Sequence, residues 1–213
     1  MGISSWMIMS KYNRAAITIF RMNTGIDAGD LILKKNITFP KNFSTPREYD
    51  EFIEKRLFKQ LKKFILDYQK TNHKKKEIKQ DDSKSIYFPR LSSEVNSWIN
   101  WNWSCHEIVD FIKAFSDPYG GAKTRVNKSK DLTIKIKKAK INQKDEGFHP
   151  FKNGLIYRIH DDKIYVACAP FSLEISKEFI EINNSELKVG DRLFTLSTDI
   201  DEAMSKRIFY LPK

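Results

Sequence analysis

The first forty residues alternate between short apolar runs and turn-forming residues. Residues 15–22, AAITIFRM, form a run rich in β-branched and aromatic side chains, and residues 31–39, LILKKNITF, form a second run before Pro40. The segment between them contains glycines and aspartates, which favour a turn. The chain is therefore predicted to begin with two β-strands joined by a tight connection.

A long amphipathic helix is predicted to follow. Thr45 is placed to cap it, Pro46 suits the first helical position, and Glu48 stands three residues after Thr45, as a capping box requires. Apolar side chains then recur every three or four residues, as on one face of a helix. They are Tyr49, Phe52, Ile53, Leu57, Leu61, Phe64, Ile65 and Tyr68. This face is predicted to lie in the core.

Residues 71–84 separate this helix from a second apolar region. They contain a single large apolar residue, Ile78, and are predicted to form an exposed linker. A shorter helix is predicted after Ser104, where Glu107 completes a capping box, and it ends at the turn sequence SDPYGGA. Its buried face comprises Ile108, Val109, Ile112 and Phe115. A domain boundary is expected between about residues 70 and 96.

The remainder has the pattern of short antiparallel strands. LTIKIKK alternates strictly until Lys137 and Lys138, where a change of phase predicts a bulge or bend. GLIYRI and KIYVAC flank a turn at HDD, and FSLEI and DRLFTL supply further strands. Short strands that follow a single helix predict a small antiparallel barrel.

The chain is strongly basic. Its 213 residues carry 38 Lys and Arg against 27 Asp and Glu, which gives a net charge of +11, and 40% of them are hydrophobic, enough for a core. Such a surface attracts phosphates and polyanions, although lysine-rich surfaces also serve solubility alone. No apolar run has the length of a membrane span and the first residues lack a signal-peptide pattern, so a cytoplasmic protein without membrane contact is expected.

Cysteine, histidine and tryptophan offer little chemistry. Cys105 and Cys168 lack metal-ligand spacing and are predicted to be reduced thiols in or near the core. The four histidines are scattered without a metal-binding pattern, so no metal site is expected. Three tryptophans could stack on bases but are predicted to be packing residues. They are Trp98, Trp101 and Trp103.

The turn sequence TGIDAGDLI raises a question of chemistry. Asp27 and Asp30 stand beside glycines, and this composition alone favours a turn. A carboxylate can also hold a neighbouring histidine in one tautomer and help to relay a proton. The residues alone favour the turn for both aspartates.

Several motifs occur in a fixed order along the chain. They are GIDAGDLI, the capped helix, YFPRL, INWNWSCHEIVDFIKAFSDPYGGA and a small β domain. This series resembles the carboxyl-terminal two thirds of the folate-dependent formyltransferases, which include methionyl-tRNA formyltransferase and the amino-sugar N-formyltransferases. The resemblance implies an α/β remnant of a Rossmann-like formyltransferase domain at residues 1–70, a linker at 71–95, and a carboxyl-terminal domain at 96–213. That last domain would contain one helix and a small antiparallel, OB-like β-barrel.

The resemblance also implies a reaction. In that family an asparagine, a histidine and an aspartate act together on 10-formyltetrahydrofolate, and Asp27 corresponds to the aspartate. The amine that attacks the formyl carbon must lose a proton, which the carboxylate and the histidine would relay, while the asparagine amide would donate to the developing oxyanion. Asp27 is therefore predicted to be catalytic and Asp30 to belong to the turn.

The sequence contains no counterpart of the family's asparagine and histidine. Those residues lie on an Asn-x-His-Pro-Ser segment upstream of the part that matches Gly2 to Met9, so the folate-binding part is expected to be missing and the chain to be inactive alone. Whether the chain is an enzyme stays open. Three hypotheses remain: a fragment of a longer enzyme, a half that pairs with a second chain carrying the folate-binding half, or a binding module for an anionic ligand.

The acceptor of the formyl group is the least specified feature. In the methionyl-tRNA enzymes the terminal barrel presents basic residues to the tRNA. Lys135 and Lys137 share the strand face opposite Ile134 and Ile136, within a lysine-rich stretch. Lys135, Lys137 and Lys140 are predicted to bind the acceptor. Initiator methionyl-tRNA, and hence a role in protein biosynthesis, is favoured over a nucleotide-linked amino sugar.

Overall fold

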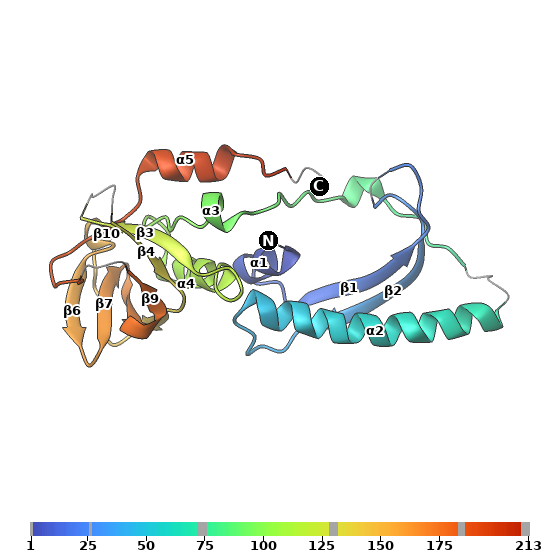
Figure 1. Ribbon diagram of the computed structural model, residues 1–213, viewed down its shortest axis with the longest axis horizontal. Coiled ribbons are helices and arrows are strands. Elements are labelled where there is room, and N and C mark those ends of the chain that lie inside the picture. The colour runs from blue at the N-terminus through green and yellow to red at the C-terminus, as the bar shows by residue number, and fades with distance from the viewer. Residues whose placement is uncertain (1, 26, 72–75, 128–131, 183–185, 210–213) are drawn as a thin grey trace. The chain divides into compact units, whose positions relative to one another are not determined.

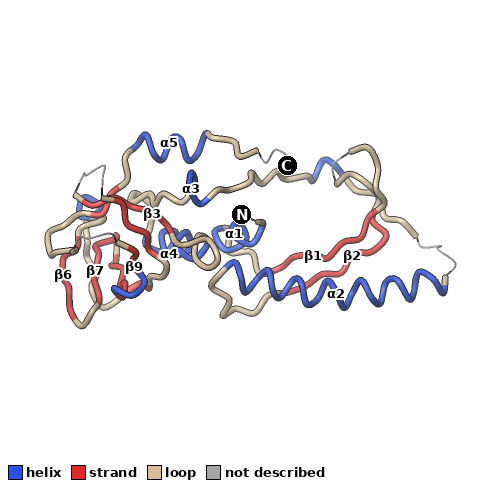
Figure 2. Tube along the Cα trace, in the orientation of Figure 1, coloured by secondary structure: helices blue, strands red, loops and turns tan. Residues whose placement is uncertain are grey.

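The computed structural model describes residues 2–25, 27–71, 76–127, 132–182 and 186–209. The chain forms two compact units. The larger unit comprises residues 1–10, 44–46 and 89–213, and the smaller unit comprises residues 11–43 and 47–88. Figures 1 and 2 show the elements of both. None of the described helices combines the length and the apolarity that crossing a bilayer takes.

A β-hairpin and one long helix make up the smaller unit. β1 (Arg14–Phe20) pairs antiparallel with β2 (Leu31–Thr38), so that the predicted strands are confirmed. α2 (Pro46–Lys70) lies alongside them (Figure 1) and begins at Pro46, as the sequence predicts.

Aromatic rings join the hairpin to the first turns of the helix. Phe39, directly after β2, is buried, and its ring centroid lies 4.7 Å from that of Tyr49 and 5.2 Å from that of Phe52. Ile17 and Ile37 are buried on the strands. Contacts of this kind add to the free energy gained by burying apolar area.

Beyond its first turns, several residues on the apolar face of α2 are exposed, whereas Phe64 and Tyr68 are partly buried. Leu57, Leu61 and Ile65 are 41%, 40% and 47% exposed, so the prediction that the whole face is core was wrong. The two-stranded sheet is shorter than α2 and too narrow to cover this face. A helix of 25 residues is about 37 Å long, whereas two strands of seven and eight residues reach only about 25 Å and form a narrow sheet.

The segment after α2 is anchored to the hairpin. Leu31 and Ile78 form an antiparallel bridge with two main-chain hydrogen bonds of 2.8 Å. Arg21 Nε donates to Glu77 Oε1 at 2.7 Å. Ile78 is nevertheless exposed, as expected of a polar connection, and a short 3₁₀ turn, η1 (Asp82–Lys84), follows.

The first helix of the chain packs against a later helix in the larger unit. α1 (Ile3–Met9) packs against α4 (Cys105–Ala114), where Ser5 Oγ donates to the carbonyl of Ala114 at 2.9 Å. This contact explains why residues 1–10 group with the later part of the chain. The functional division into residues 1–70, 71–95 and 96–213 stays a prediction.

α4 matches its sequence prediction closely. The Ser104 hydroxyl accepts from the main-chain N–H of Glu107, and the Glu107 carboxylate accepts from the main-chain N–H of Ser104, at 2.8 Å, which completes the capping box. The predicted face is buried: it comprises Ile108, Val109, Ile112 and Phe115. The remaining helical elements of the unit are α3 (Ser93–Asn96), α5 (Ser197–Ser205), η2 (Pro150–Lys152) and η3 (Lys177–Phe179).

Two four-stranded antiparallel sheets form the rest of the larger unit. One has the order β10-β3-β4-β9, and its strands are β3 (Ala122–Val126), β4 (Thr133–Ile136), β9 (Ile180–Glu181) and β10 (Leu193–Phe194). The other has the order β5-β8-β7-β6, and its strands are β5 (Lys140–Asn142), β6 (Ile156–His160), β7 (Lys163–Cys168) and β8 (Phe171–Ser176). Buried isoleucine and leucine side chains line both sheets.

The change of phase at residues 137 and 138 marks the passage from one sheet to the other. β4 ends at Ile136, and β5 begins at Lys140 in the second sheet. Gly121 is required here, because a Cβ at this residue would lie 2.9 Å from the carbonyl oxygen of Ile136. The predicted bend is therefore confirmed.

Candidate functional site

Asp27 lies in the exposed connection between β1 and β2. Its φ of 53° is in the left-handed region, which Asp tolerates better than most residues. Gly29 cannot carry a side chain, because a Cβ there would lie 1.5 Å from the carbonyl oxygen of Arg21. The sequence thus folds into a turn for steric reasons.

The turn is held through its main chain. Gln80 Nε2 donates to the carbonyl oxygens of Asp27 and Gly29, at 2.7 Å each. Among the described residues, the carboxylates of Asp27 and Asp30 have no hydrogen-bonding or ion-pair partner. Because neither carboxylate is used to hold the turn, both remain available for chemistry.

The predicted acceptor residues Lys135 and Lys137 share one partner. Their ammonium groups lie 3.0 Å and 3.1 Å from the two carboxylate oxygens of Glu181, and these contacts lower the pKa of that carboxyl group. Ile134 and Ile136 are fully buried on the opposite face, so the predicted orientation is confirmed. Both lysines are about half exposed, and Glu181 offsets part of their charge.

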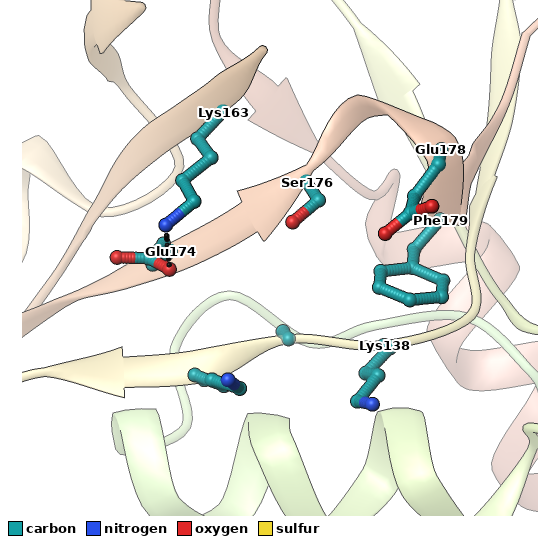
Figure 3. Close-up of a pocket in the computed structure, with 8 residues that line it drawn as sticks. Lys138, Lys163, Glu174, Ser176, Glu178 and Phe179 are labelled. Atoms are coloured by element: carbon teal, nitrogen blue, oxygen red, sulfur yellow. Dashed lines mark ion pairs between the residues drawn. The ribbon is translucent and has the colours of Figure 1, made fainter. Parts of the chain in front are cut away.

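Lys140, the third predicted residue, lines a hollow of about 260 Å³. The other lining residues are Lys138, Ala139, Lys163, Glu174, Ser176, Glu178 and Phe179. In Figure 3 Lys163 and Glu174 point toward each other, and their ion pair is 2.9 Å long. Three lysines and two glutamates give this hollow a mixed charge, so the structure places Lys140 in different surroundings from Lys135 and Lys137.

The tryptophans are packing residues. Trp101 is buried and its Nε1 donates to Thr124 Oγ1 at 2.9 Å. Trp98 lies beneath two cations, with Lys123 Nζ 4.3 Å and Arg125 Cζ 4.7 Å from its ring. Burial lowers the pKa of Lys123, the direction that desolvation produces for an ammonium group.

The two cysteines are also structural. Cys105 and Cys168 are fully buried free thiols. Burial, with a smaller contribution from Cys105, raises the pKa of Cys168 to about 12. Cys168 is therefore a neutral thiol at physiological pH and not a nucleophile.

A polar cluster surrounds Tyr157 on the second sheet. Its hydroxyl lies 2.6 Å from Asp145 Oδ2 and 2.9 Å from Ser172 Oγ, and Arg158 also pairs with Asp145. Burial and the nearby carboxylate raise the pKa of Tyr157 to about 12, so this phenol cannot serve as a base near neutrality. Within the described residues, no group of three or more metal-ligating side chains occurs.

Comparison with known proteins now assigns much of the larger unit. Residues 92–189 match the family model described as the formyl transferase C-terminal domain. This part of the chain is similar to that domain family. The chain as a whole is similar to methionyl-tRNA formyltransferases, with 26% identity to the Ruminiclostridium cellulolyticum protein over 94% of this chain and 61% of that protein. The Kosmotoga olearia protein is 30% identical over 76% of this chain and 49% of its own length.

Solved formyltransferase structures share the fold. An N-formyltransferase from Helicobacter canadensis, crystallised with folinic acid and dTDP-3-aminofucose, superposes with a TM-score of 0.54 at 20% identity over 81% of this chain and 59% of that one. The sugar 3N-formyltransferase WlaRD, crystallised with dTDP and 5-N-formyl-tetrahydrofolate, superposes with a TM-score of 0.56. The two are 20% identical over 86% of this chain and 60% of that one. The chain spans about 60% of the length of the first relatives it matches, and this corresponds to their carboxyl-terminal part.

Proposed function

We propose that this chain serves formyl transfer from 10-formyltetrahydrofolate to a primary amine, as the carboxyl-terminal part of a formyltransferase. The observation that carries this proposal is the similarity to methionyl-tRNA formyltransferases along 94% of the chain, together with the family match at residues 92–189. The folate would be the formyl donor of the complete enzyme. The part of the relatives that this chain does not span would contribute the folate site.

The finer architecture belongs to the same proposal. Residues 1–70 are a remnant of the Rossmann-like catalytic domain, residues 71–95 are the linker, and residues 96–213 are the carboxyl-terminal domain with an OB-like barrel. The two antiparallel sheets and the strand passage at residues 137–139 are compatible with such a barrel.

Asp27 is the proposed catalytic carboxylate. It lies on an exposed turn whose main-chain carbonyl groups accept hydrogen bonds from Gln80. The turn is therefore held without the carboxylate of Asp27. Beside a histidine supplied by the rest of the enzyme, it would hold the imidazole in one tautomer and stabilise its protonated form as the amine loses its proton. Asp30 is proposed to remain a turn residue.

The exposed apolar face of α2 is proposed to contact a further part of the protein. Leu57, Leu61 and Ile65 recur at intervals of four residues and are exposed in the described structure, which costs free energy in water. The proposed occupant is the amino-terminal part of the formyltransferase fold, because about 40% of the relatives' length has no counterpart in this chain. That part would be supplied either by a longer polypeptide or by a second chain.

Initiator methionyl-tRNA is the proposed acceptor. The methionyl-tRNA enzymes are the relatives found by sequence, and Lys135, Lys137 and Lys140 lie on the surface of the carboxyl-terminal domain. A nucleotide-linked amino sugar is the alternative, favoured by the ligands of the Helicobacter canadensis and WlaRD structures. A binding module for an anionic ligand, without catalysis, is the third candidate and rests on the net charge of +11.

A complementation assay tests the proposal. The amino-terminal part of the Clostridium perfringens methionyl-tRNA formyltransferase is fused ahead of Met1, and formyl transfer from 10-formyltetrahydrofolate is followed with methionyl-tRNA and with a dTDP-linked amino sugar. We expect transfer to methionyl-tRNA by the fusion and none by the chain alone. The intact C. perfringens enzyme is the positive control.

The other results of this assay discriminate between the candidates. Transfer to the amino sugar alone would replace the proposed acceptor by the alternative. A folded fusion that binds both folate and tRNA but transfers nothing would favour the non-catalytic binding module.

A further inference from the structure

A groove between β2 and α2 in the smaller unit is lined mostly by basic and polar side chains. It has a volume of about 520 Å³. Its lining residues are Lys35, Asn36, Ile37, Thr38, Lys55, Arg56, Lys59 and Gln60. Four of the eight are cationic and none is acidic. No local sequence pattern marks these residues, because two stretches about twenty residues apart contribute to the groove.

The cations of this groove differ from the paired lysines on the sheets of the larger unit. In the described part of the chain, no ion pair engages Lys35, Lys55, Arg56 or Lys59. Lys135, Lys137 and Lys163, by contrast, each lie within 3.1 Å of a glutamate oxygen. The groove therefore presents the stronger attraction for an external anion.

The positions of the groove residues follow from the geometry of α2 and β2. Lys55 and Lys59 stand one helical turn apart on the flank of α2, so their ammonium groups can follow an extended ligand along the helix axis over about 6 Å. Four consecutive residues of β2 contribute, although successive side chains of a strand point to opposite faces. The groove therefore includes the outer edge of β2 as well as one of its faces.

The Phe52 ring orients the planar guanidinium of Arg56. Its Cζ lies 3.3 Å from the centroid of the Phe52 ring, which fixes the guanidinium plane and leaves its N–H groups unused. A guanidinium so oriented can donate two parallel hydrogen bonds to one phosphate group. This restraint reduces the entropy lost when a ligand binds.

The neutral lining residues narrow the class of ligand. Asn36, Thr38 and Gln60 offer amide and hydroxyl groups between the cations. Lysine, arginine, asparagine, glutamine and threonine are the side chains that hydrogen-bond to nucleic-acid phosphates. The single apolar lining residue, Ile37, is buried, so the apolar surface of the groove belongs to the stems of its basic and polar side chains.

We propose that the β2–α2 groove binds the phosphate backbone of RNA. The choice of RNA rests on the proposed tRNA acceptor, whereas the groove's affinity for phosphates rests on its own residues. The groove adds a second cationic surface for phosphates, separate from the lysines at residues 135–140. Each phosphate bound by a lysine releases counterions, so the contribution of this groove depends on salt.

The test measures binding of fluorescein-labelled initiator tRNA to the full chain by anisotropy across a salt series. Lys55→Glu/Lys59→Glu should weaken binding by about tenfold or more and reduce the logarithmic salt slope by about 1.4 to 1.8. Lys62→Glu/Lys79→Glu is the matched control: it makes the same change of net charge at exposed lysines outside the groove lining. This control should weaken binding by less than about threefold.

Arg56→Lys separates geometry from charge. It keeps the positive charge but removes the planar pair of donors, so binding should weaken by a few-fold with the salt slope nearly unchanged. Circular dichroism of each variant verifies that α2 is intact. An unlabelled dTDP competitor distinguishes the source of the phosphates, and we expect it to leave the tRNA bound.

Three results would overturn the proposal. Equal losses in the groove and control variants would show that net charge alone attracts the RNA. Unchanged affinity in the groove variants, with binding lost on Lys135→Glu/Lys137→Glu/Lys140→Glu, would reject the groove and leave the proposed acceptor in place. Displacement by dTDP at the concentration of the tRNA would assign the groove to a small phosphate ligand. Formyl transfer is not measured, so failure of the proposed reaction cannot mimic any of these results.

Discussion

Cys168 shows how strongly a single residue's environment determines its chemistry. Burial raises the pKa of its thiol to about 12, and Cys105 is equally inaccessible. Because only a thiolate exposed to solvent reacts with a disulfide reagent, both cysteines should label at least about a hundredfold more slowly in the folded chain than in urea. The reaction with 5,5′-dithiobis(2-nitrobenzoate) at pH 8 measures both rates. Rapid labelling of either folded thiol would contradict the structural role assigned to it.

Glu181 makes a residue-scale prediction about the β4 lysines. It binds Lys135 and Lys137 at 3.0 Å and 3.1 Å, so it competes with any phosphate for the same two ammonium groups. Glu181→Gln should therefore strengthen tRNA binding by about threefold or more and steepen its salt dependence, as seen by anisotropy. Glu178→Gln, which changes the net charge equally but pairs with neither lysine in the described structure, is the control. Equal effects of the two substitutions would remove these lysines from the tRNA surface.

At the scale of elements, α2 has two different surfaces along one helix. Tyr49 and Phe52 pack on Phe39, whereas Leu61 is 40% exposed. In the chain alone, Leu61→Gln should change the free energy of unfolding in urea by less than about 0.5 kcal/mol, because little apolar area is lost from the core. Phe39→Ala should cost about 3 to 5 kcal/mol.

The same substitution should behave differently in the fusion with an amino-terminal formyltransferase part. There the apolar face of α2 would be covered, so Leu61→Gln should cost at least about 1.5 kcal/mol. An equally small effect in both proteins would reject this face as the contact for an amino-terminal formyltransferase part.

These elements also show which features a sequence can predict. α4 was predicted together with its capping box and its buried face, because both signals are local. The passage from β4 to β5 was visible as a change of phase at Lys137. The exposure of Leu61 could not be predicted, because periodicity identifies an apolar face but not the width of the sheet that covers it.

The candidate sites divide in the same way. The strand periodicity placed Lys135 and Lys137 on one face, but their common partner Glu181 comes from β9, more than forty residues later. The groove depends on β2 lying beside α2, a tertiary contact without a local signal. Asp27 was identified by resemblance, and its turn geometry, with the main chain held by Gln80, became visible only in the structure.

On the scale of the whole molecule, the two units have different relations to formyltransferases. The larger unit contains residues 92–189, which match the carboxyl-terminal domain family, and residues 1–10 add α1 to it. The smaller unit carries Asp27, the basic groove and the uncovered face of α2. We propose that the smaller unit contacts the amino-terminal part of a formyltransferase fold and provides one of the two RNA-binding surfaces, the other being the lysines at residues 135–140.

The central claim is that Asp27 is a catalytic carboxylate of a formyltransferase, and turnover in the fusion with the C. perfringens amino-terminal part tests it most directly. Asp27→Asn should lower kcat by about a hundredfold or more, because it removes the carboxylate that supports proton transfer while keeping the shape of the side chain. Asp30→Asn, in the same turn, should lower it by less than about threefold. Equal and small effects at both positions would contradict the account and leave TGIDAGD a turn.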